Sequence, residues 1–512
     1  MRLPSLSPTA AAATAAVLLT QLTTASPTTH ITKRQAALDD CLAAAGVPTA
    51  AHNSSDWDYG AHAFNQRLKY TPAAIAIPTT TEHVRLAVEC AARTGVKVSA
   101  KCGGHSYASF GIGGEDGHLV VHLDSMDEVV LDKETGVATV QAGARLGHVA
   151  TVLAAEGRDF SHGTCPGVGV SGHTLHGGFG FSSHTHGLAL DAAVGATVVL
   201  ANGTVVETSK TVNPSLFWAL RGAGSNFGVV VSWSFQTFSV PPVVTAFEIN
   251  LPQWRSNATN LAAGFSNLQD WLLAGGMPRE LNMRILANGF TFRLEGLYHG
   301  DKTGFWSAIT PLLPLLGTNV NATNVRELDW MSGFRAFANA FVIDTKRPHR
   351  EQETFYTKSL VTGALPADVL QNVATYWVNA ARTASGRSWY VIIDMYGGPN
   401  SAITAVGKDE TSYAFRDPKK HLFLYQFNDS IFFGSYPANG FSFLDNWIKA
   451  FTDGLSEDEW GMYINYADPR LDRDTAQEVY YRDSLPRLRQ LKKELDPNEV
   501  FYYPQAIKPA EF

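Results

Sequence analysis

The sequence predicts an α+β protein in which a glycine-rich part of short elements is followed by a part with longer strands. Between residues 70 and 240, short β-rich runs alternate with helical patterns and glycine-rich turns. From residue 242 to about residue 458, longer stretches alternate between apolar and polar residues, with helical segments between them. The last fifty or so residues return to helical patterning, and we expect them to complete the first part as a discontinuous domain.

The expected elements follow in order along the chain. In the first part, strands are expected at residues 74–77, 97–100, 119–123 and 138–141, with a helix at residues 82–93. Pro241 and Pro242 mark a boundary, and beyond it strands are expected at residues 290–298, 388–395 and 422–427. A helix at residues 474–493, ended by Asp496 and Pro497, and a strand at residues 500–503 close the chain. The expected first domain comprises residues 35–241 together with the C-terminal segment 459–512, and the expected second domain comprises residues 242–458.

Composition excludes some classes of partner. The chain has 512 residues, 45% hydrophobic and 17% charged, which is enough for two or three domains with a sizeable core. The net charge is −7 and no basic run occurs, so neither a nucleic acid nor an anionic membrane is an expected partner. Nothing in the sequence requires more than a monomer, which is our expectation.

The N-terminus has the layout of a secretory signal. Arg2 is followed by an apolar stretch at residues 10–19 and then by small residues, and this stretch is too short to span a bilayer. The pair Lys33 and Arg34 indicates removal of a short pro-segment, the alternative being an ordinary exposed charged pair. We therefore expect residues 1–34 to be removed and a secreted, extracellular protein to begin near Gln35.

Five Asn-x-Ser/Thr sequons fit a secreted glycoprotein, although some of them should be empty. They lie at Asn53, Asn202, Asn257, Asn321 and Asn428.

Four cysteines allow three complete pairings, and an oxidising compartment makes a disulfide expected. Cys41 and Cys90 both lie in helix-like apolar patterns, where cysteine is usually a core residue or a staple, and we pair them. Cys102 and Cys165 lie in glycine-rich loops. They form either a second disulfide, or one of them is bonded to something else.

Two glycine-rich loops each carry a nucleophilic side chain. Residues 101–107 contain His105 and residues 161–172 contain Cys165, both among glycines that let a backbone approach a flat or phosphorylated ligand. Inward-facing N–H groups of residues 102–106 could hold a pyrophosphate, although neither a dinucleotide-binding fingerprint nor a P-loop is present. Two tethers in two loops indicate one bound cofactor.

These loops and four further motifs resemble one enzyme family. The motifs are residues 101–106, 162–166, 172–180, 216–222, 463–468 and 496–501. They are similar to those of the berberine-bridge-enzyme-like branch of the FAD-linked oxidases, in the vanillyl-alcohol-oxidase superfamily, and most similar to the fungal glucooligosaccharide oxidases. The likeness runs from about Cys41 to the C-terminus. It implies a discontinuous FAD-binding domain of the PCMH type and a substrate domain whose large antiparallel sheet is covered by helices.

The resemblance implies an FAD held by two covalent bonds, from His105 to the 8α-methyl carbon and from Cys165 to ring carbon 6. A neutral imidazole and a thiolate are nucleophilic enough for such bonds. Cys102 stands where the family usually has glycine and is the alternative tether. The other cofactor-binding residues implied are Lys101, Gly103, Gly104, Ser106, Gly169, Gly172, His173, Gly177 and Gly178.

The resemblance also implies the catalytic residues. Hydride transfer from an alcohol to a flavin needs a base for the hydroxyl proton, and in this family the base is a tyrosine, here Tyr466, assisted by an aspartate, here Asp394. The alternatives are a core tyrosine and a carboxylate that caps a backbone or pairs with an arginine. A small residue three positions after the tethering cysteine, here Val168, implies access for oxygen, so we expect an oxidase that forms hydrogen peroxide.

The implied substrate is an oligosaccharide, oxidised at its reducing-end C1 hydroxyl to a lactone. The implied substrate-binding residues are Tyr107, Gln426, Tyr390 and Thr164. The chain departs from the family with Tyr390 in place of tryptophan, Ile392 in place of glutamine and Phe179 in place of tyrosine, which leaves the preferred sugar open. Strand aromatics that could stack on sugars or simply fill the sheet core are Trp389, Tyr390, Tyr396, Tyr425 and Phe427.

Three other functions stay open at this point. The protein could be a secondary-metabolite oxidase acting on another alcohol or an amine, a sugar dehydrogenase with another electron acceptor, or a carbohydrate-binding protein without catalysis. A metal site is not expected, although His184 and His186 would place two rings on one face of a strand. No carboxylate accompanies the histidines at ligand spacing.

Overall fold

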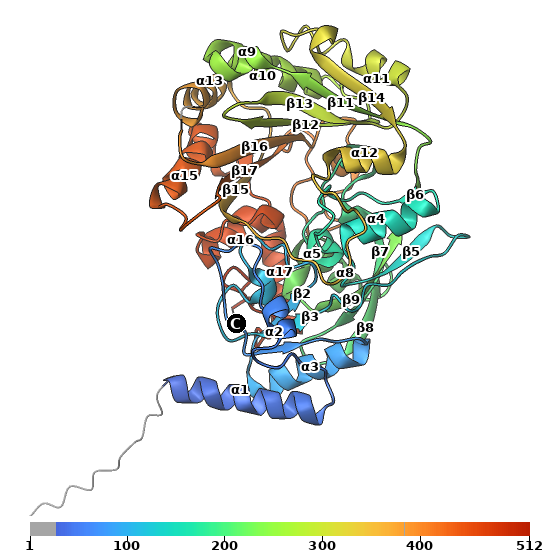
Figure 1. Ribbon diagram of the computed structural model, residues 1–512, viewed down its shortest axis with the longest axis vertical. Helices are drawn as coiled ribbons and strands as arrows, with labels where there is room; N and C mark the ends of the chain where they lie inside the picture. The colour runs from blue at the N-terminus through green and yellow to red at the C-terminus, as the bar shows by residue number, and fades with distance from the viewer. Residues whose placement is uncertain (1–26, 383, 512) are drawn as a thin grey trace, which may run out of the picture.

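The structure is a computed structural model that describes residues 27–382 and 384–511. Most of the predicted signal segment lies outside the described residues. Lys33 and Arg34, the predicted processing pair, are exposed on helix α1 (Pro27–Ala44). Two sheet systems lie one above the other (Figure 1), which confirms the α+β class.

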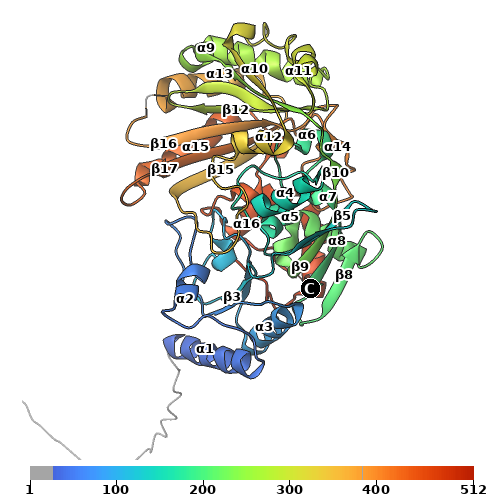
Figure 2. The same cartoon turned by 45° about the vertical axis from the view of Figure 1, so that its right-hand side comes forward.

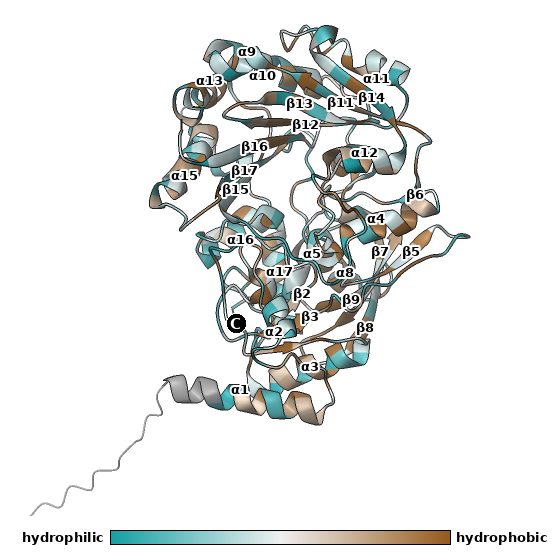
Figure 3. Cartoon of the chain, viewed as in Figure 1, coloured by the Kyte–Doolittle hydropathy of each residue, from teal (hydrophilic) through white to brown (hydrophobic). Residues whose placement is uncertain are grey.

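The N-terminal part opens with a small parallel sheet. Its strands lie in the order β1 (Ala74–Ala76), β3 (Leu119–His122) and β2 (Val98–Lys101). Helix α3 (Thr81–Thr94) begins where the Thr80 side chain accepts the His83 N–H and ends at Gly95, whose φ of 70° suits glycine. Its buried residues are Val84, Ala87, Val88, Cys90 and Ala91, and hydrophobic and hydrophilic stretches both appear along it in Figure 3. Cys90 forms a disulfide with Cys41 of α1, which is the predicted pairing.

A five-stranded antiparallel sheet completes the scaffold of this part. Its strand order is β4 (Val129–Leu131), β5 (Val137–Gln141), β9 (Val229–Gln236), β7 (Ala193–Val199) and β8 (Val205–Ser209). The associated helices are α2 (Ser55–Gly60), α4 (Leu146–Ala155), α5 (Val170–Leu175), α6 (Ser183–His186), α7 (Ala189–Ala192) and α8 (Pro214–Ala223). A two-stranded ribbon, β6 (Arg158–Asp159) with β10 (Phe238–Ser239), precedes the second part.

The second part is an eight-stranded antiparallel sheet covered by helices on its outer face (Figures 1 and 2). The strand order is β14 (Thr323–Leu328), β11 (Val244–Asn250), β13 (Phe292–Tyr298), β12 (Leu281–Asn288), β16 (Ser388–Met395), β17 (Phe423–Ile431), β15 (Thr354–Thr362) and β18 (Trp460–Gly461). The helices are α9 (Pro252–Ser256), α10 (Ala258–Leu273), α11 (Lys302–Ile309), α12 (Trp330–Phe337), α13 (Ala367–Tyr376), α14 (Ala402–Ala405) and α15 (Ala438–Thr452).

Strand periodicity decides which side chains face the first part. Along β16, Trp389, Val391 and Ile393 are buried in the main core, whereas Tyr390 and Ile392, between them, are half-buried on the other face. Tyr425 and Phe427 of β17 lie in the same core and contact Phe451 of α15.

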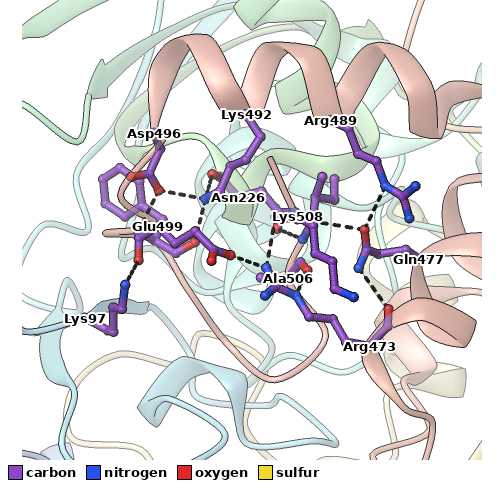
Figure 4. A network of polar contacts seen from close by, with 12 residues as sticks. Lys97, Asn226, Arg473, Gln477, Arg489, Lys492, Asp496, Glu499, Ala506 and Lys508 are labelled. Atoms are coloured by element: carbon purple, nitrogen blue, oxygen red, sulfur yellow. Dashed lines mark hydrogen bonds and ion pairs between the residues drawn. The ribbon is translucent and has the colours of Figure 1, made fainter. Parts of the chain in front are cut away.

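The C-terminal segment returns to the first part, as Figure 4 shows. The buried Lys492 ammonium donates to the carbonyl of Asn226 (2.7 Å), to the carbonyl of Phe501 (2.8 Å) and to Asp496 (2.7 Å). The Lys97 ammonium donates to the carbonyl of Glu499 at 2.7 Å. These bonds fasten residues far apart in the sequence, and a buried lysine needs such partners.

Two expectations for this segment are wrong in detail. The helix expected at residues 474–493 is broken into α16 (Arg473–Tyr481) and α17 (Leu485–Leu495), because Pro486 lacks an N–H and starts a new helix. The strand expected at residues 500–503 is a loop, since the N–H groups of Val500 and Phe501 donate to the Asp496 carboxylate instead of a neighbouring strand.

In the described part of the chain, no helix is long and apolar enough to cross a membrane.

Candidate functional site

The two glycine-rich loops meet backbone to backbone. A Cβ on Gly103 would lie 2.3 Å from the backbone nitrogen of Gly169, and one on Gly169 would lie 2.3 Å from the Cys102 sulfur. The buried Arg145 guanidinium joins the loops by donating to the carbonyls of Gly103 (3.0 Å) and Gly167 (2.8 Å). Glycine is therefore required at 103 and 169 by close approach, because no side chain fits there.

The two free cysteines have opposite surroundings. Cys102 is buried against Gly169. Cys165 is exposed. No disulfide joins the two, so the second pairing considered from the sequence is wrong. An exposed thiol can react with a bound ligand, whereas the Cys102 side chain fills the contact between the two loops.

A cavity lies along both loops. Residues of the first loop from Lys101 to Tyr107 line it, and so do residues of the second loop from Val168. A Cβ on Gly172 would meet no protein atom within 4 Å, so this glycine leaves open space in the wall. His105 and Ser106 also line the cavity, and His105 is stacked on Phe64 with ring centroids 4.5 Å apart. A glycine-lined cavity with an imidazole on its wall and an exposed thiol in the second loop fits a flat, phosphorylated cofactor.

Lys101 supports this wall from behind. Its buried ammonium donates to the carbonyls of Tyr59 (3.1 Å), Gly60 (2.8 Å) and His62 (3.0 Å), which uses all three N–H groups. Burial lowers the pKa of Lys101 to about 7. Gly104 has a φ of 75°, and a Cβ there would meet the Lys101 side chain at 2.7 Å. Lys101 thus contributes its stem to the cavity, while its ammonium group holds the C-terminal end of α2 and His62 beyond it.

His173 lines the cavity, and behind it Gly178 packs on the His173 ring while Gly177 packs on Tyr463. The Gly163 N–H donates to Nε2 of His173 at 3.0 Å, and burial lowers the pKa of this histidine to about 3, so it is neutral. The Gly178 N–H donates to the Tyr463 hydroxyl at 2.8 Å. Gly177 and Gly178 have φ of 142° and 88°, which favour glycine.

Tyr466 and Asp394 approach the cavity from different parts of the fold. Tyr466 ends a short 3-10 turn (Ile464–Tyr466) and lines the cavity. Asp394, on β16, is 3% exposed, and burial raises its pKa to about 7. Burial and the negative charge of Asp394 raise the pKa of Tyr466 well above its usual value. The phenol is therefore protonated on its own, and a carboxyl that titrates near neutral pH lies close enough to influence it.

A row of charges crosses the large sheet to Asp394. Arg284 on β12 lies opposite Asp394 and also opposite Glu295 on β13. The Arg284 guanidinium is 2.8 Å from the buried Glu295 carboxylate. The positive charge of Arg284 lowers the pKa of Asp394 and the negative charge of Glu295 raises it, while burial has the largest effect. The pKa of Asp394 near neutrality thus results from contributions of opposite sign.

Three polar side chains, those of Tyr107, Gln426 and Tyr390, form a cluster beside Tyr466. The Tyr107 ring is stacked on Tyr466 with centroids 5.9 Å apart. The Gln426 amide donates to the hydroxyls of Tyr107 (3.2 Å) and Tyr390 (3.3 Å). The structure therefore brings together three of the four substrate-binding candidates with the proposed base, at the junction of the two parts.

The other candidates lie further from this cluster. Thr164 lines a separate small cavity beside α12. Phe179 packs on the cluster that contains Tyr463, with Tyr466 at its edge. Ile392 lies opposite Gln426 on the neighbouring strand and offers no hydrogen bond. Of the five strand aromatics, only Tyr390 faces the site, because Trp389, Tyr425 and Phe427 are in the main core and Tyr396 is in the smaller one.

Val168 is half-buried on the cavity wall, three residues after Cys165. His184 and His186 lie on helix α6, so they are not on one face of a strand. Among the described residues, no group of three or more histidine, cysteine, aspartate or glutamate side chains could hold a metal ion.

Four of the five sequon asparagines are exposed, namely Asn53, Asn202, Asn257 and Asn321, whereas Asn428 is only 1% exposed.

Several residues of the site carry no local signal in the sequence. Arg145, Arg284 and Glu295 lie outside the recognised motifs, in or beside ordinary helix or strand patterns. Glu351 and His349 lie in a loop of the second part, yet Glu351 reaches His105. Only the pairing of strands and the return of this loop to the first part reveal these contacts.

Comparison with known proteins shows a common family and fold. The FAD binding domain family matches residues 72–209, and the family described as berberine and berberine like matches residues 462–508. A xylooligosaccharide oxidase of Thermothelomyces thermophilus is 62% identical over 480 residues, covering 93% of this chain and 95% of that protein. A glucooligosaccharide oxidase of Sarocladium strictum is 41% identical, covering 97% and 98%.

Solved structures agree closely. A xylooligosaccharide oxidase from Myceliophthora thermophila, solved with xylobiose, has a TM-score of 0.91 and 61% identity and covers 93% of this chain and 100% of that one. A glucooligosaccharide oxidase from Acremonium strictum, described with a 6-S-cysteinyl, 8α-N1-histidyl FAD, has a TM-score of 0.88 and 40% identity with the same coverage.

Proposed function

The chain belongs to the berberine-bridge-enzyme-like family of FAD-linked oxidases, and from that premise we propose that it is a flavin-dependent oligosaccharide oxidase acting on the reducing-end C1 hydroxyl. One observation carries the proposal. The cavity that His105 lines is also lined by Tyr107 and Tyr466, and Gln426 joins Tyr107 to Tyr390 by hydrogen bonds. A cofactor site and a sugar site thus share one wall.

The residues of the chain fit an FAD bound through His105 and Cys165. When bound, the flavin supplies the hydride acceptor for oxidation of the sugar carbon. Gly103, Gly104, Ser106, Gly169, Gly172, His173, Gly177 and Gly178 would hold it, and Lys101 would stiffen the loop behind it. The neutral His173 adds no charge to this wall.

Tyr466 and Asp394 work as one proton acceptor. The phenol oxygen of Tyr466 takes the hydroxyl proton of the sugar and passes its own proton toward Asp394. A free tyrosinate would be costly here, because burial and Asp394 both raise the pKa of Tyr466. Asp394, with a pKa of about 7, is half-ionised at neutral pH and is suited to receive the proton.

Tyr107, Gln426 and Tyr390 orient the sugar. Gln426 holds both tyrosine hydroxyls, so the two rings present fixed polar edges to a substrate. Ile392 replaces a polar partner beside Gln426, which removes one hydrogen bond from the site. Together with the 62% identity to a xylooligosaccharide oxidase, this supports xylooligosaccharides as the preferred substrates.

Oxygen is the proposed electron acceptor and hydrogen peroxide the product, since Val168 leaves room on the cavity wall. The lactone then hydrolyses to an aldonic acid.

We further propose a secreted monomer with residues 1–34 removed, glycosylated at some of the four exposed sequons. Asn428 is too buried to accept a glycan. Residues 35–241 and 459–512 would form the FAD-binding domain and residues 242–458 the substrate domain.

A peroxide assay on xylo-, cello- and chito-oligosaccharides tests the proposal. We expect activity on oligosaccharides, highest on the xylo series, together with yellow protein whose flavin stays in the acid-precipitated pellet. Absence of activity on every sugar would contradict the proposal and would favour the secondary-metabolite oxidase. Activity only with an artificial electron acceptor would indicate a dehydrogenase, and colourless protein would indicate a binding protein.

A further inference from the structure

A strap from the second part crosses both glycine-rich loops. The strap, residues 343–353, lies between α12 and β15, where the chain leaves the large sheet (Figure 1). Near its start, the Thr345 hydroxyl donates to the carbonyl of Pro166 at 2.7 Å, beside Cys165. Asp344 accepts a 2.8 Å bond from the His148 ring on α4. The strap is thereby fixed to the loop that carries the cysteine.

The other end of the strap is fixed beside His105. The Glu353 N–H donates to the carbonyl of Phe64, and the Glu353 carbonyl accepts from the Gln66 N–H, both at 2.9 Å. The His62 ring bonds to the carbonyl of Glu351 at 3.0 Å. Because Phe64 is the residue on which His105 stacks, these bonds hold this end of the strap next to the His105 ring.

Glu351 and His349 point from the strap toward His105. Oε2 of Glu351 is 3.1 Å from Nε2 of His105, and Oε1 is 2.7 Å from Nε2 of His349. The first contact is close in distance but lacks the alignment of a full hydrogen bond, and it is an ion pair only when His105 is protonated. The two histidines hold the pKa of Glu351 well below its usual range, so the side chain is a carboxylate.

Gly167 makes room for this pair. A Cβ on Gly167 would lie 2.5 Å from Nε2 of His349 and 2.7 Å from Oε1 of Glu351. Gly167 is two residues after Cys165, so Glu351 contacts His105 and also lies beside the loop that carries Cys165. This position explains the glycine without any contact to a ligand.

The carboxylate decides which ring nitrogen of His105 can react. A neutral imidazole carries one proton, and a carboxylate next to Nε2 favours the tautomer with that proton on Nε2. The lone pair then lies on Nδ1, the nitrogen that can form a bond. We propose that Glu351, held by His349, is a positioning residue that orients His105 for its covalent bond to the flavin. This inference rests on the covalent attachment in the proposed function.

The attachment balances with molecular oxygen as the oxidant. One C–H bond of the 8α-methyl group breaks and one bond from that carbon to Nδ1 forms. The methyl group and Nε2 each lose a proton, and two electrons pass through the ring to oxygen, which becomes hydrogen peroxide. Glu351 stabilises the positive charge that develops on the imidazole until its proton leaves.

The test measures attachment rather than turnover. In a Cys165→Ala background, flavin in the acid-precipitated pellet reports the bond to His105 alone. We expect Glu351→Gln in this background to lower the retained flavin by about tenfold, by analogy with the loss seen when the carboxylate that orients a metal-ligating histidine is removed. Glu353→Gln, which removes a like charge two residues along the strap, should retain as much flavin as Cys165→Ala alone.

The single variant Glu351→Gln keeps the experiment decisive. It should still hold flavin through Cys165, and mass spectrometry of a digest should find the flavin on the Cys165 peptide and not on the His105 peptide. Full attachment at His105 in Glu351→Gln would overturn the inference, and so would complete loss of flavin from the single variant, since Glu351 would then serve binding. Absence of flavin on His105 in the unmodified protein would instead contradict the proposed function.

Discussion

Removal of the Glu295 charge should shift the pH dependence of the enzyme. Glu295, Arg284 and Asp394 are neighbours across three adjacent strands. With strands about 4.8 Å apart, Glu295 and Asp394 are separated by about 10 Å. At an effective dielectric constant of about 20, two charges at that distance interact by about 1.7 kcal/mol, or roughly one pKa unit.

The sign follows from the charge that is removed. Glu295 raises the pKa of Asp394, so Glu295→Gln lowers it from about 7 toward about 6. Because the carboxylate of Asp394 is the form that accepts a proton, activity is lost as pH falls through this pKa. The acidic limb of kcat/KM against pH should therefore move to lower pH by about one unit in the variant.

The assay is oxygen consumption at low oligosaccharide concentration between pH 5 and pH 9, normalised to flavin content. Glu248 continues the same row on β11 but is a third exposed, so Glu248→Gln is the matched control and should leave the limb in place. Breaking the buried pair with Arg284 should also cost about 3 kcal/mol of stability, measurable by thermal unfolding. An acidic limb that stays in place or moves to higher pH would refute the role of Asp394.

Three further predictions concern single side chains. Tyr466→Phe should stay yellow and lose about 10²-fold or more of kcat, and full turnover would exclude it as the base. Cys165→Ala should leave flavin attached at one point, whereas Cys102→Ala should keep the spectrum of the unmodified protein; the reverse pattern would make Cys102 the tether. Cys41→Ser should lower the free energy of unfolding by about 4 kcal/mol, from a disulfide that closes 49 residues, and an unchanged denaturation midpoint would contradict this.

Local patterns in the sequence were sufficient to predict the strands, the disulfide and the two glycine-rich loops. The strand expected at residues 388–395 coincides with β16, because alternation of apolar residues is a local property. The pairing of Cys41 with Cys90 followed from two helical patterns, and α1 and α3 are joined by that bond. The sequence failed where a local pattern had a competing cause, as at Pro486, which splits the C-terminal helix, and at Asp496, which caps the loop after it.

The sequence by itself determined that two glycine-rich loops carry His105 and Cys165, since glycines and nucleophiles at close spacing are visible in one dimension. Only the tertiary structure decided how they are used. Cys102 differs from Cys165 through burial against Gly169, and Asp394 obtains a pKa of about 7 mainly from burial, opposed by Arg284 and reinforced by Glu295 on neighbouring strands. Glu351 reaches His105 from 246 residues away in the chain. Burial and electrostatic interaction depend on distances in space, which the order of residues does not contain.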